Sequence, residues 1–402
     1  MSGGPDALKS VTILGTTGSV GRSTADLVAH HAERFDVYAL TAHKDVKTLA
    51  AEALRLKAKK AVIADPDLYA SLKEALSGSS TEAQAGEAAL VDAAAHPVDW
   101  TMGAIAGFAG LKPLLAAAER GGILAIANKE PLVAAGEILK DTAHQAKSVL
   151  LPVDSEHNAI FQCLQPENSA QVQRVTLTAS GGPFLNKSLD EMAHATPEEA
   201  VAHPTWSMGA KISVDSATLM NKGLELIEAH ILFDLPDEKL DVVIHPQSLV
   251  HAFVSYADGS ILSHMGASDM KVPILHTLAW PHRMENPTPV LDIQTLGRLD
   301  FQPVDHAKFP ALHLARQAMK AGLRARIVLN AANEVAVAAF LGKHLPFHGI
   351  IETVSAILDV EGSGKAPQSL EEILFLDQDV RAITKNYILN RTHKNSHYGT
   401  SG

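Results

Sequence analysis

Short apolar runs alternate with segments of helical periodicity from residue 11 to residue 127. Runs of apolar residues that end in glycine or polar clusters predict buried strands, and apolar positions three or four residues apart predict helices. The predicted strands are residues 11–14, 37–40, 61–64, 101–106 and 123–127, and the predicted helices are 22–31 and 49–57. Strands that alternate with helices are typical of parallel βαβ units.

The pattern changes after Val153. Strands are predicted at 174–179, 241–244, 249–256 and 260–264, and helices at 156–164 and 216–233. Ala257-Asp258-Gly259 separates the last two strands and predicts a hairpin turn. Residues 280–305 are rich in proline and lack periodicity, which predicts a linker, whereas helical spacing recurs at 311–319, 330–341, 350–358 and 379–390. The polar tail from residue 390 to residue 402 is predicted to be disordered.

These elements predict an α/β chain with three domains. We expect an N-terminal Rossmann-like parallel-sheet domain at residues 1–153 and a central α+β domain at 154–282. A linker at 283–307 would lead to a C-terminal α-helical bundle at 308–402.

Composition narrows the classes of protein. The 402 residues carry a net charge of -11, which argues against general nucleic-acid binding because that needs a basic surface. Cys163 is the single cysteine, so neither an intramolecular disulfide nor a thiolate metal cluster is possible, as suits a reducing compartment. With no apolar run of a signal peptide and no stretch near the roughly 18 apolar residues of a membrane span, we expect a cytoplasmic protein. The sequence does not decide whether an organellar leader has been cleaved from the protein.

A glycine-rich loop follows the first strand. Gly15, Gly18 and Gly21 have the spacing G-x-x-G-x-x-G, a variant of the dinucleotide fingerprint, between a predicted strand and a predicted helix. Such a loop lets backbone N–H groups at a helix N-terminus meet a pyrophosphate. The alternative is a glycine turn that only packs strand against helix.

The end of the second strand favours NADP over NAD. An NAD site has an acid there for the ribose 2′-hydroxyl, but Asp36 precedes the predicted strand and His43 and Lys44 follow it. A lysine and a histidine suit a 2′-phosphate. The alternative is a solvated lysine.

Two carboxylates come close together in the sequence at Asp154 and Glu156. In extended chain, residues i and i+2 point to the same side, and two carboxylates on one side require a cation between them. The alternative is a helix N-terminus in which Asp154 or Ser155 caps the helix and Glu156 favours its dipole. The spacing alone leaves both open.

Small hydrogen-bond donors gather in three segments, namely residues 180–182, 211–216 and 221–225. Ser216, Asn221 and Lys222 lie near one predicted helix start, where N–H groups favour an anion. Glu225, three residues after Lys222, adds a third carboxylate on the neighbouring helix surface. Helix capping with a Lys–Glu surface pair is the alternative.

Two histidines and the cysteine have simpler alternatives. His203 begins a loop, residues 203–209, that contains Trp206 and Gly209 and either closes over a ligand or lies on the surface. His251 lies within a predicted strand, where a packed histidine is the plain interpretation. Cys163 lies on the apolar side of a predicted helix and is interpreted as core.

Taken together, these segments resemble the 1-deoxy-D-xylulose 5-phosphate reductoisomerase family. The resemblance rests on LGTTGSVG at 14–21, ANKE at 127–130, PVDSEHNAIFQ at 152–162, SGGPF at 180–184, residues 203–228, HPQS at 245–248, Asp269-Met270 and NAANE at 330–334. These motifs occur in the family's order over nearly the whole chain. Departures from the commoner pattern are His43, Asp45, Pro131 and Ala179.

The resemblance implies an NADPH-binding first domain, a catalytic and dimer-forming second domain and a helical third domain. It implies a divalent cation, Mg²⁺ or Mn²⁺ with Co²⁺ as a third candidate, held by Asp154, Glu156 and Glu225. The implied catalytic residues are these three with Lys129, His203 and Trp206. The implied substrate-binding residues are Ser155, Ser180, His203, Ser216, Asn221, Lys222 and His251. The implied NADPH contacts are Thr16, Thr17, Gly18, Ser19, Val20, Ala42, His43, Lys44, Asn128, Lys129, Glu130, Met208, Gly209 and Met270.

The implied partners are a small phosphorylated sugar and a second copy of the chain, with no nucleic acid or membrane. The family's reaction converts 1-deoxy-D-xylulose 5-phosphate to 2-C-methyl-D-erythritol 4-phosphate by rearrangement and reduction. Two rival classes are an NADP-binding sensor without catalysis and a thioester-type aldehyde dehydrogenase. The first should lack a carboxylate or a phosphate donor, and the second needs a reactive Cys163.

Overall fold

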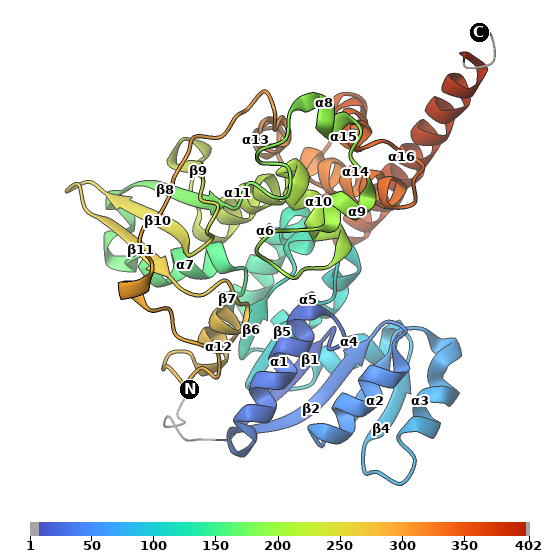
Figure 1. The fold of residues 1–402 in the computed structure, drawn as a ribbon. Helices are drawn as coiled ribbons and strands as arrows, with labels where there is room; N and C mark the ends of the chain where they lie inside the picture. Colours follow the sequence, from blue (N-terminus) through green and yellow to red (C-terminus); the bar gives the residue numbers. More distant parts are fainter. Residues whose placement is uncertain (1–7, 399–402) are drawn as a thin grey trace. The chain divides into compact units, whose positions relative to one another are not determined.

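The computed structural model describes residues 8–398, with side-chain surroundings for residues 8–391 (Figure 1). The chain forms two compact units. The first comprises Met1–Pro131, Glu137–Phe161 and Asp269–Leu291, and the second comprises Leu132–Gly136, Gln162–Ser268 and Asp292–Gly402. The three-domain boundaries given above stay a prediction.

A seven-stranded parallel sheet forms the centre of the first unit, as predicted for a Rossmann-like fold. Its strands are β1 (Lys9–Leu14), β2 (Phe35–Ala42), β3 (Lys60–Ile63), β4 (Glu82–Ala85), β5 (Trp100–Gly103), β6 (Ile123–Ile126) and β7 (Val149–Pro152). Their spatial order is β4-β3-β2-β1-β5-β6-β7, and every neighbouring pair is parallel. The strand order reverses beside β1, where open parallel sheets bind ligands at the strands' carboxyl ends.

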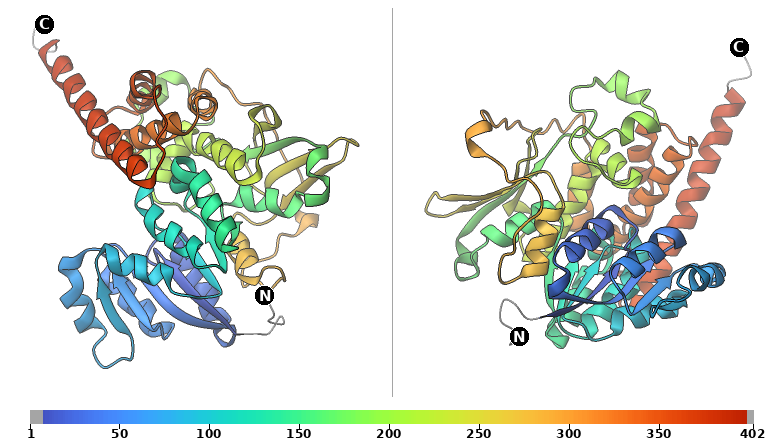
Figure 2. Two further views of the ribbon diagram at one scale, coloured as in Figure 1. Left: turned by 180° about the vertical axis from the view of Figure 1, so that it is seen from behind. Right: turned by 60° about the horizontal axis from the view of Figure 1, so that its bottom comes forward.

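Helices cover both faces of this sheet (Figure 2). They are α1 (Ser19–His30), α2 (Val46–Arg55), α3 (Tyr69–Ala75), α4 (Glu87–Ala95), α5 (Leu111–Glu119), α6 (Lys129–Ala146), α7 (Ser155–Cys163) and α12 (Lys271–Ala279), of which α6 and α7 also contribute residues to the second unit. The late helix α12 belongs here because its apolar residues complete the core and the Trp100 indole donates to the Thr277 carbonyl at 3.1 Å. Lys9 also donates to the Leu278 carbonyl, at 3.2 Å.

A four-stranded mixed sheet lies in the second unit. Its strands are β8 (Val172–Ala179), β9 (Leu240–Ile244), β10 (Val250–Tyr256) and β11 (Ile261–Met265), in the order β11-β10-β8-β9. The predicted hairpin is confirmed, since β10 and β11 are antiparallel and Gly259 has φ +86° in the turn. Only glycine adopts that conformation readily.

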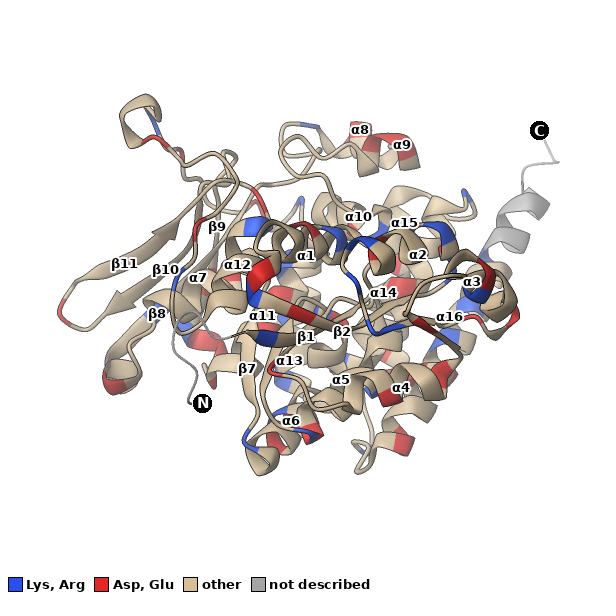
Figure 3. Ribbon diagram, turned by 90° about the horizontal axis from the view of Figure 1, so that it is seen from below, with Lys and Arg blue, Asp and Glu red and all other residues tan. Residues whose placement is uncertain are grey.

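The helices of the second unit are α8 (Leu189–Ala193), α9 (Pro197–Val201), α10 (Ala210–Thr218), α11 (Met220–Phe233), α13 (Ala311–Ala321), α14 (Leu323–Leu341), α15 (Phe347–Glu361) and α16 (Leu370–Tyr398). Short 3₁₀ turns lie at Ala32–Arg34, Pro66–Leu68, Phe108–Gly110, Pro166–Gln171, Asp237–Lys239 and Ile293–Thr295. Helices α8 and α9 each begin with a capping box, and Figure 3 shows the acidic residues of their first turns. Acids at a helix N-terminus are favoured by its dipole.

Two predictions about the helices were wrong. The predicted helix 216–233 is instead the end of α10 and the whole of α11, because Leu219 between them is left-handed at φ +59°. The tail predicted to be disordered from residue 390 continues α16 as far as Tyr398, and an ion pair from Arg391 to Glu352 fastens this helix to α15. Residues 399–402 lie outside the described part of the chain.

Candidate active site

The glycine loop has two positions that require glycine for internal reasons and one that does not. Gly15 has φ +85°, and a Cβ there would lie 2.4 Å from the Ala104 carbonyl oxygen. A Cβ on Gly21 would lie 2.1 Å from the Gly15 carbonyl oxygen, whereas one on Gly18 would come no nearer than 3.5 Å to it. A Cβ at Gly18 would make only an ordinary van der Waals contact, so the protein's own packing does not require glycine there.

The loop presents the N-terminus of α1. Gly15 N–H donates to the Thr41 hydroxyl at 2.9 Å, and Thr16 N–H donates to the Thr41 carbonyl at 2.8 Å, so the tip of β2 fixes the loop. Gly18 is the N-cap of α1 and has no side chain to cap it. The first-turn N–H groups, beside Thr17, Ser19 and Val20, thus form an anion-binding end.

The end of β2 presents basic residues. Ala42 is buried as the last residue of the strand, and His43 and Lys44 are exposed after it. Asp45, a departure from the family pattern, caps α2 by accepting from the Thr48 N–H at 3.0 Å, and this bond lowers the pKa of Asp45. Its carboxylate is thereby engaged in a helix cap. Strand β2 begins at Phe35, two residues before the predicted strand, so Asp36 lies inside it. The Asp36 carboxylate pairs with the Lys59 ammonium at 2.5 Å.

Asn128, Lys129 and Glu130 are all buried at the start of α6. The Asn128 amide donates to the carbonyls of Ile105 and Gly107, which fixes the loop after β5. Lys129 Nζ lies 2.7 Å from Asp154 Oδ2. Met270 is the N-cap of α12 and packs partly buried against the first unit's core.

Helix α7 begins at Ser155, so of the two alternatives left open by the sequence, extended chain does not apply to Asp154 and Glu156. The Asp154 carbonyl accepts from the Asn158 N–H at 2.8 Å as the first turn of the helix forms. Carboxylate oxygens of Asp154 and Glu156 nevertheless lie within 4.8 Å of each other, and the Ser155 hydroxyl donates to Glu156 at 2.6 Å. The helix-start alternative therefore describes the backbone, while the pair of acids is still close enough to share a cation.

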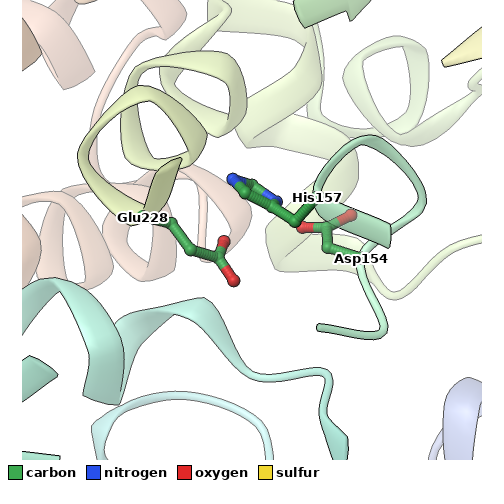
Figure 4. A group of neighbouring side chains, drawn as sticks. All are labelled: Asp154, His157 and Glu228. Atoms are coloured by element: carbon green, nitrogen blue, oxygen red, sulfur yellow. The ribbon is translucent and has the colours of Figure 1, made fainter. Parts of the chain in front are cut away.

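Sequence reasoning did not single out His157 and Asn158. A ring nitrogen of His157 lies within 4.8 Å of the Asp154 carboxylate (Figure 4), and Asn158 donates to the Pro152 carbonyl at 2.8 Å. The Asn158 amide is also 3.0 Å from His276 Nδ1 of α12. Spacing of three residues from Asp154 on a helix was the available signal for His157. Figure 4 also labels Glu228, a residue of α11 that is 1% exposed.

The predicted phosphate donors of the second unit come from three elements. Gly182 has φ +66°, and a Cβ there would lie 2.7 Å from the Ser216 carbonyl oxygen, so the loop holding Ser180 lies against the end of α10. Ser216 is in the last turn of α10, which corrects its predicted place at a helix start. Asn221 and Lys222 do lie in the first turn of α11. Ser180, Ser216 and the start of α11 thus meet around one helix break.

Glu225 is fully buried on α11, with an exposed fraction of 0%. The Asn221 amide donates to its Oε1 and the Lys222 ammonium donates to its Oε2. The Lys–Glu pair proposed as a surface alternative exists, but it is buried, since Lys222 is 3% exposed. A buried carboxylate between two such donors is held in one place.

The loop after α9 contains His203 in a defined tautomer. Its Nδ1 accepts from the N–H groups of Thr205 and Trp206, at 3.1 and 2.9 Å. Nε2 must then carry the proton and donate to the Ser180 hydroxyl, 2.9 Å away. Burial lowers the pKa of His203, in agreement with a neutral ring.

The Trp206 indole lies 6.3 Å from the His251 ring, measured between centroids, and His251 is 4% exposed in β10. Met208 and Gly209 follow, and Gly209 is the N-cap of α10. The loop, residues 203–209, therefore leads directly from His203, the partner of Ser180, to α10, which carries Ser216 in its last turn.

Three family models match most of the chain. Residues 11–136 match 1-deoxy-D-xylulose 5-phosphate reductoisomerase, residues 150–233 match its C-terminal domain model, and residues 265–383 match the DXP reductoisomerase C-terminal domain model. The 1-deoxy-D-xylulose 5-phosphate reductoisomerase of Zymomonas mobilis is 55% identical over 93% of this chain and 96% of its own length. The chain belongs to the 1-deoxy-D-xylulose 5-phosphate reductoisomerase family.

Solved structures of reductoisomerases agree with this fold. The Zymomonas mobilis enzyme in complex with NADPH has a TM-score of 0.89 and 53% identity, covering 95% of this chain and 99% of its own. A DOX-P reductoisomerase in complex with NADPH, fosmidomycin and magnesium has a TM-score of 0.91 and 44% identity, covering 95% and 98%.

Two further observations concern this reductoisomerase family member. Cys163 is buried, and burial raises the pKa of its thiol, which opposes the thiolate that a thioester mechanism needs. Among the described residues, none of the helices combines the length and the apolar character that crossing a membrane requires.

Proposed function

We propose that this chain reduces and rearranges 1-deoxy-D-xylulose 5-phosphate to 2-C-methyl-D-erythritol 4-phosphate, the entry step of the non-mevalonate isoprenoid pathway. The observation that carries the proposal is the 55% identity to the Zymomonas mobilis enzyme over nearly the full length of both chains. We also propose that it acts in the cytoplasm as a homodimer with the three-domain division given above. In the reaction, the C3–C4 bond breaks and the fragments rejoin as a branched aldehyde, for which a direct α-ketol shift is the rival description.

The first unit fits NADPH. The uncapped N-terminus of α1 and the lack of a side chain at Gly18 suit a pyrophosphate, and the exposed His43 and Lys44 suit a 2′-phosphate. Asp45 is engaged in capping α2 and so does not occupy the place of an NAD-specific acid. The proposed contacts continue through Asn128, Lys129 and Glu130 to Met208, Gly209 and Met270.

The acids fit a hard divalent cation. We assign Asp154, Glu156 and Glu225 as its ligands, because all three offer carboxylate oxygens, which Mg²⁺ and Mn²⁺ prefer. When bound, NADPH would supply the hydride that reduces the aldehyde, and the cation would stabilise negative charge on the substrate oxygens during the rearrangement. Lys129, now 2.7 Å from Asp154, and Ser155 would contact the substrate oxygens beside these ligands.

The second unit fits the phosphate of the substrate. The proposed donors are Ser180, Ser216, Asn221 and Lys222. The phosphate that they would bind is remote from the reacting carbons of the substrate. Binding energy from a remote phosphate can orient the substrate and close a loop over it. His203, Trp206 and Met208 would form that loop with His251 beneath it, so that water is excluded from a reactive aldehyde.

The test is loss of NADPH absorbance with purified protein, 1-deoxy-D-xylulose 5-phosphate and Mn²⁺, with and without a chelator. Oxidation that requires both substrate and metal is the expected result. NADPH binding without any oxidation would overturn the proposal in favour of an NADP-binding sensor.

A further inference from the structure

A buried carboxylate stands directly before the proposed phosphate donor Ser216. Asp215 is 1% exposed, although it is a charged residue near the end of α10. Its Oδ1 accepts from the Asn333 amide of α14 at 2.8 Å, and its Oδ2 lies 2.8 Å from Lys211 Nζ. Asn333 is itself fully buried. A buried charge persists only where such partners satisfy it, so this group is held in one orientation.

The contacts of Asp215 with Lys211 and Asn333 hold α10 in one rotation about its helix axis. Lys211 and Asp215 are four residues apart and therefore share one face of α10, and Asn333 holds that face against α14. Ser216 is the next residue, about 100° further round the helix, which follows from 3.6 residues per turn. Its direction is thus set by the anchored neighbour, while its carbonyl lies against Gly182.

Asp215 is also linked to the start of α11 through its backbone carbonyl. The Asp215 carbonyl accepts from the Thr218 hydroxyl at 3.2 Å, and that hydroxyl accepts from the Met220 N–H at 3.2 Å. This pair of bonds spans Leu219, whose left-handed conformation is unfavourable for a residue with a branched side chain. The bridge therefore stabilises the helix break, after which Asn221 and Lys222 follow.

We propose that Asp215 is a positioning residue for the phosphate site: its side chain anchors α10 to α14 through Asn333 and Lys211, and its carbonyl holds the helix break through Thr218. The proposal rests on the proposed function, because it takes Ser216, Asn221 and Lys222 as phosphate donors. Lys211 has a second effect, since it neutralises a carboxylate that would otherwise repel the incoming phosphate.

The test compares phosphonate binding with NADPH binding in Asp215→Asn. Fosmidomycin provides the phosphonate probe, measured by calorimetry with Mn²⁺ and NADPH present. We expect its affinity to fall about tenfold or more, as for the loss of a charge-assisted hydrogen bond, while NADPH affinity changes less than about twofold. In turnover, KM for the phosphorylated sugar should rise more than kcat falls.

Two further variants keep the proposal falsifiable. The exchange Asp215→Asn with Asn333→Asp retains one carboxylate and one amide between α10 and α14 and should restore much of the phosphonate affinity. Thr218→Val removes only the hydroxyl bridge and should also weaken the phosphonate selectively. Equal losses of fosmidomycin and NADPH binding, or an unchanged fosmidomycin affinity in Asp215→Asn and Thr218→Val, would overturn the positioning role.

The result for the unaltered protein separates this proposal from the reaction. Fosmidomycin binding without turnover of the sugar would overturn the proposed reaction, and the Asp215 comparison would still decide the positioning role. Absence of fosmidomycin binding in the unaltered protein would overturn both.

Discussion

The two units offer different kinds of hydrogen-bond donor for the anions that we propose they bind. In the first unit, backbone N–H groups at the start of α1 are the proposed NADPH site, and Gly15 and Gly21 are required by the close approach of backbone to backbone. In the second unit, the proposed donors are side chains. Asn221 and Lys222 donate to the buried Glu225, and Asp215 is the proposed anchor for Ser216. A site made of backbone N–H groups depends on chain conformation, and a site made of side chains depends on the hydrogen bonds and ion pairs that hold those side chains. The two should therefore fail differently when single residues are changed.

The largest effect is expected from Glu225→Gln. This change removes a proposed ligand charge while keeping the side chain's size, so turnover should fall about a thousandfold because several kcal/mol of charge stabilisation are lost. NADPH affinity should stay within about twofold. Turnover against Mn²⁺ concentration measures the loss, and full activity at low metal would exclude Glu225 as a ligand.

Lys222→Ala tests the side-chain site while keeping all three proposed metal ligands, although it removes the ammonium that donates to one of them, Glu225. We expect KM to rise and kcat to fall together, with kcat/KM about a hundredfold lower, since a charge-assisted phosphate contact also orients the substrate. Lys187→Ala provides the control, because Lys187 forms a solvent-accessible pair with Glu199 and should change kcat/KM less than about twofold. An unaltered kcat/KM in Lys222→Ala would contradict the assignment.

Gly15→Ala and Gly18→Ala form a matched pair for the backbone site. Gly15→Ala places a Cβ 2.4 Å from a carbonyl oxygen at φ +85° and should destabilise the protein by about 1–3 kcal/mol. Gly18→Ala has no such clash and should keep its Tm, yet it should weaken NADPH by about tenfold if the pyrophosphate approaches there. Thermal unfolding with and without NADPH measures both. Unchanged NADPH affinity in Gly18→Ala would return the loop to a packing role.

The smallest effect should come from pH through His203. The folded-state pKa lies below the ordinary 6.5 because burial disfavours the charged ring, so the neutral form contributes fully above pH 6.5. That contribution is lost as pH falls below 6.5 through the lowered pKa, because protonated Nδ1 no longer accepts from Thr205 and Trp206. KM for the sugar should then rise severalfold more steeply in the unaltered protein than in His203→Asn. Parallel pH profiles would count against this.

The backbone site was the more predictable of the two from sequence. Alternating strands and helices and the glycine spacing indicated the parallel sheet and its loop, because both follow from local pattern. Strand β4 was missed because Glu82–Ala85 has no apolar run and is held by pairing with β3. The break at Leu219 was missed because a left-handed leucine carries no sequence signal, and the Thr218 bridge that supports it is visible only in three dimensions.

The acidic residues also have roles that depend on local structure and could not be read from the sequence. Type and spacing of Asp154 and Glu156 indicated a cation, but the sequence did not decide between strand and helix start, and the structure shows the helix start. Asp45 could not be assigned from sequence either, since its role as the cap of α2 depends on the Thr48 N–H.

The most direct test of the central claim is the fate of the sugar's carbons. Carbon-13-labelled 1-deoxy-D-xylulose 5-phosphate would be incubated with the protein, NADPH and Mn²⁺, and the product examined by NMR. The account predicts one branched product, 2-C-methyl-D-erythritol 4-phosphate, formed in equal amount to the NADPH oxidised. A linear reduced sugar, or NADPH oxidation without a branched carbon skeleton, would contradict it.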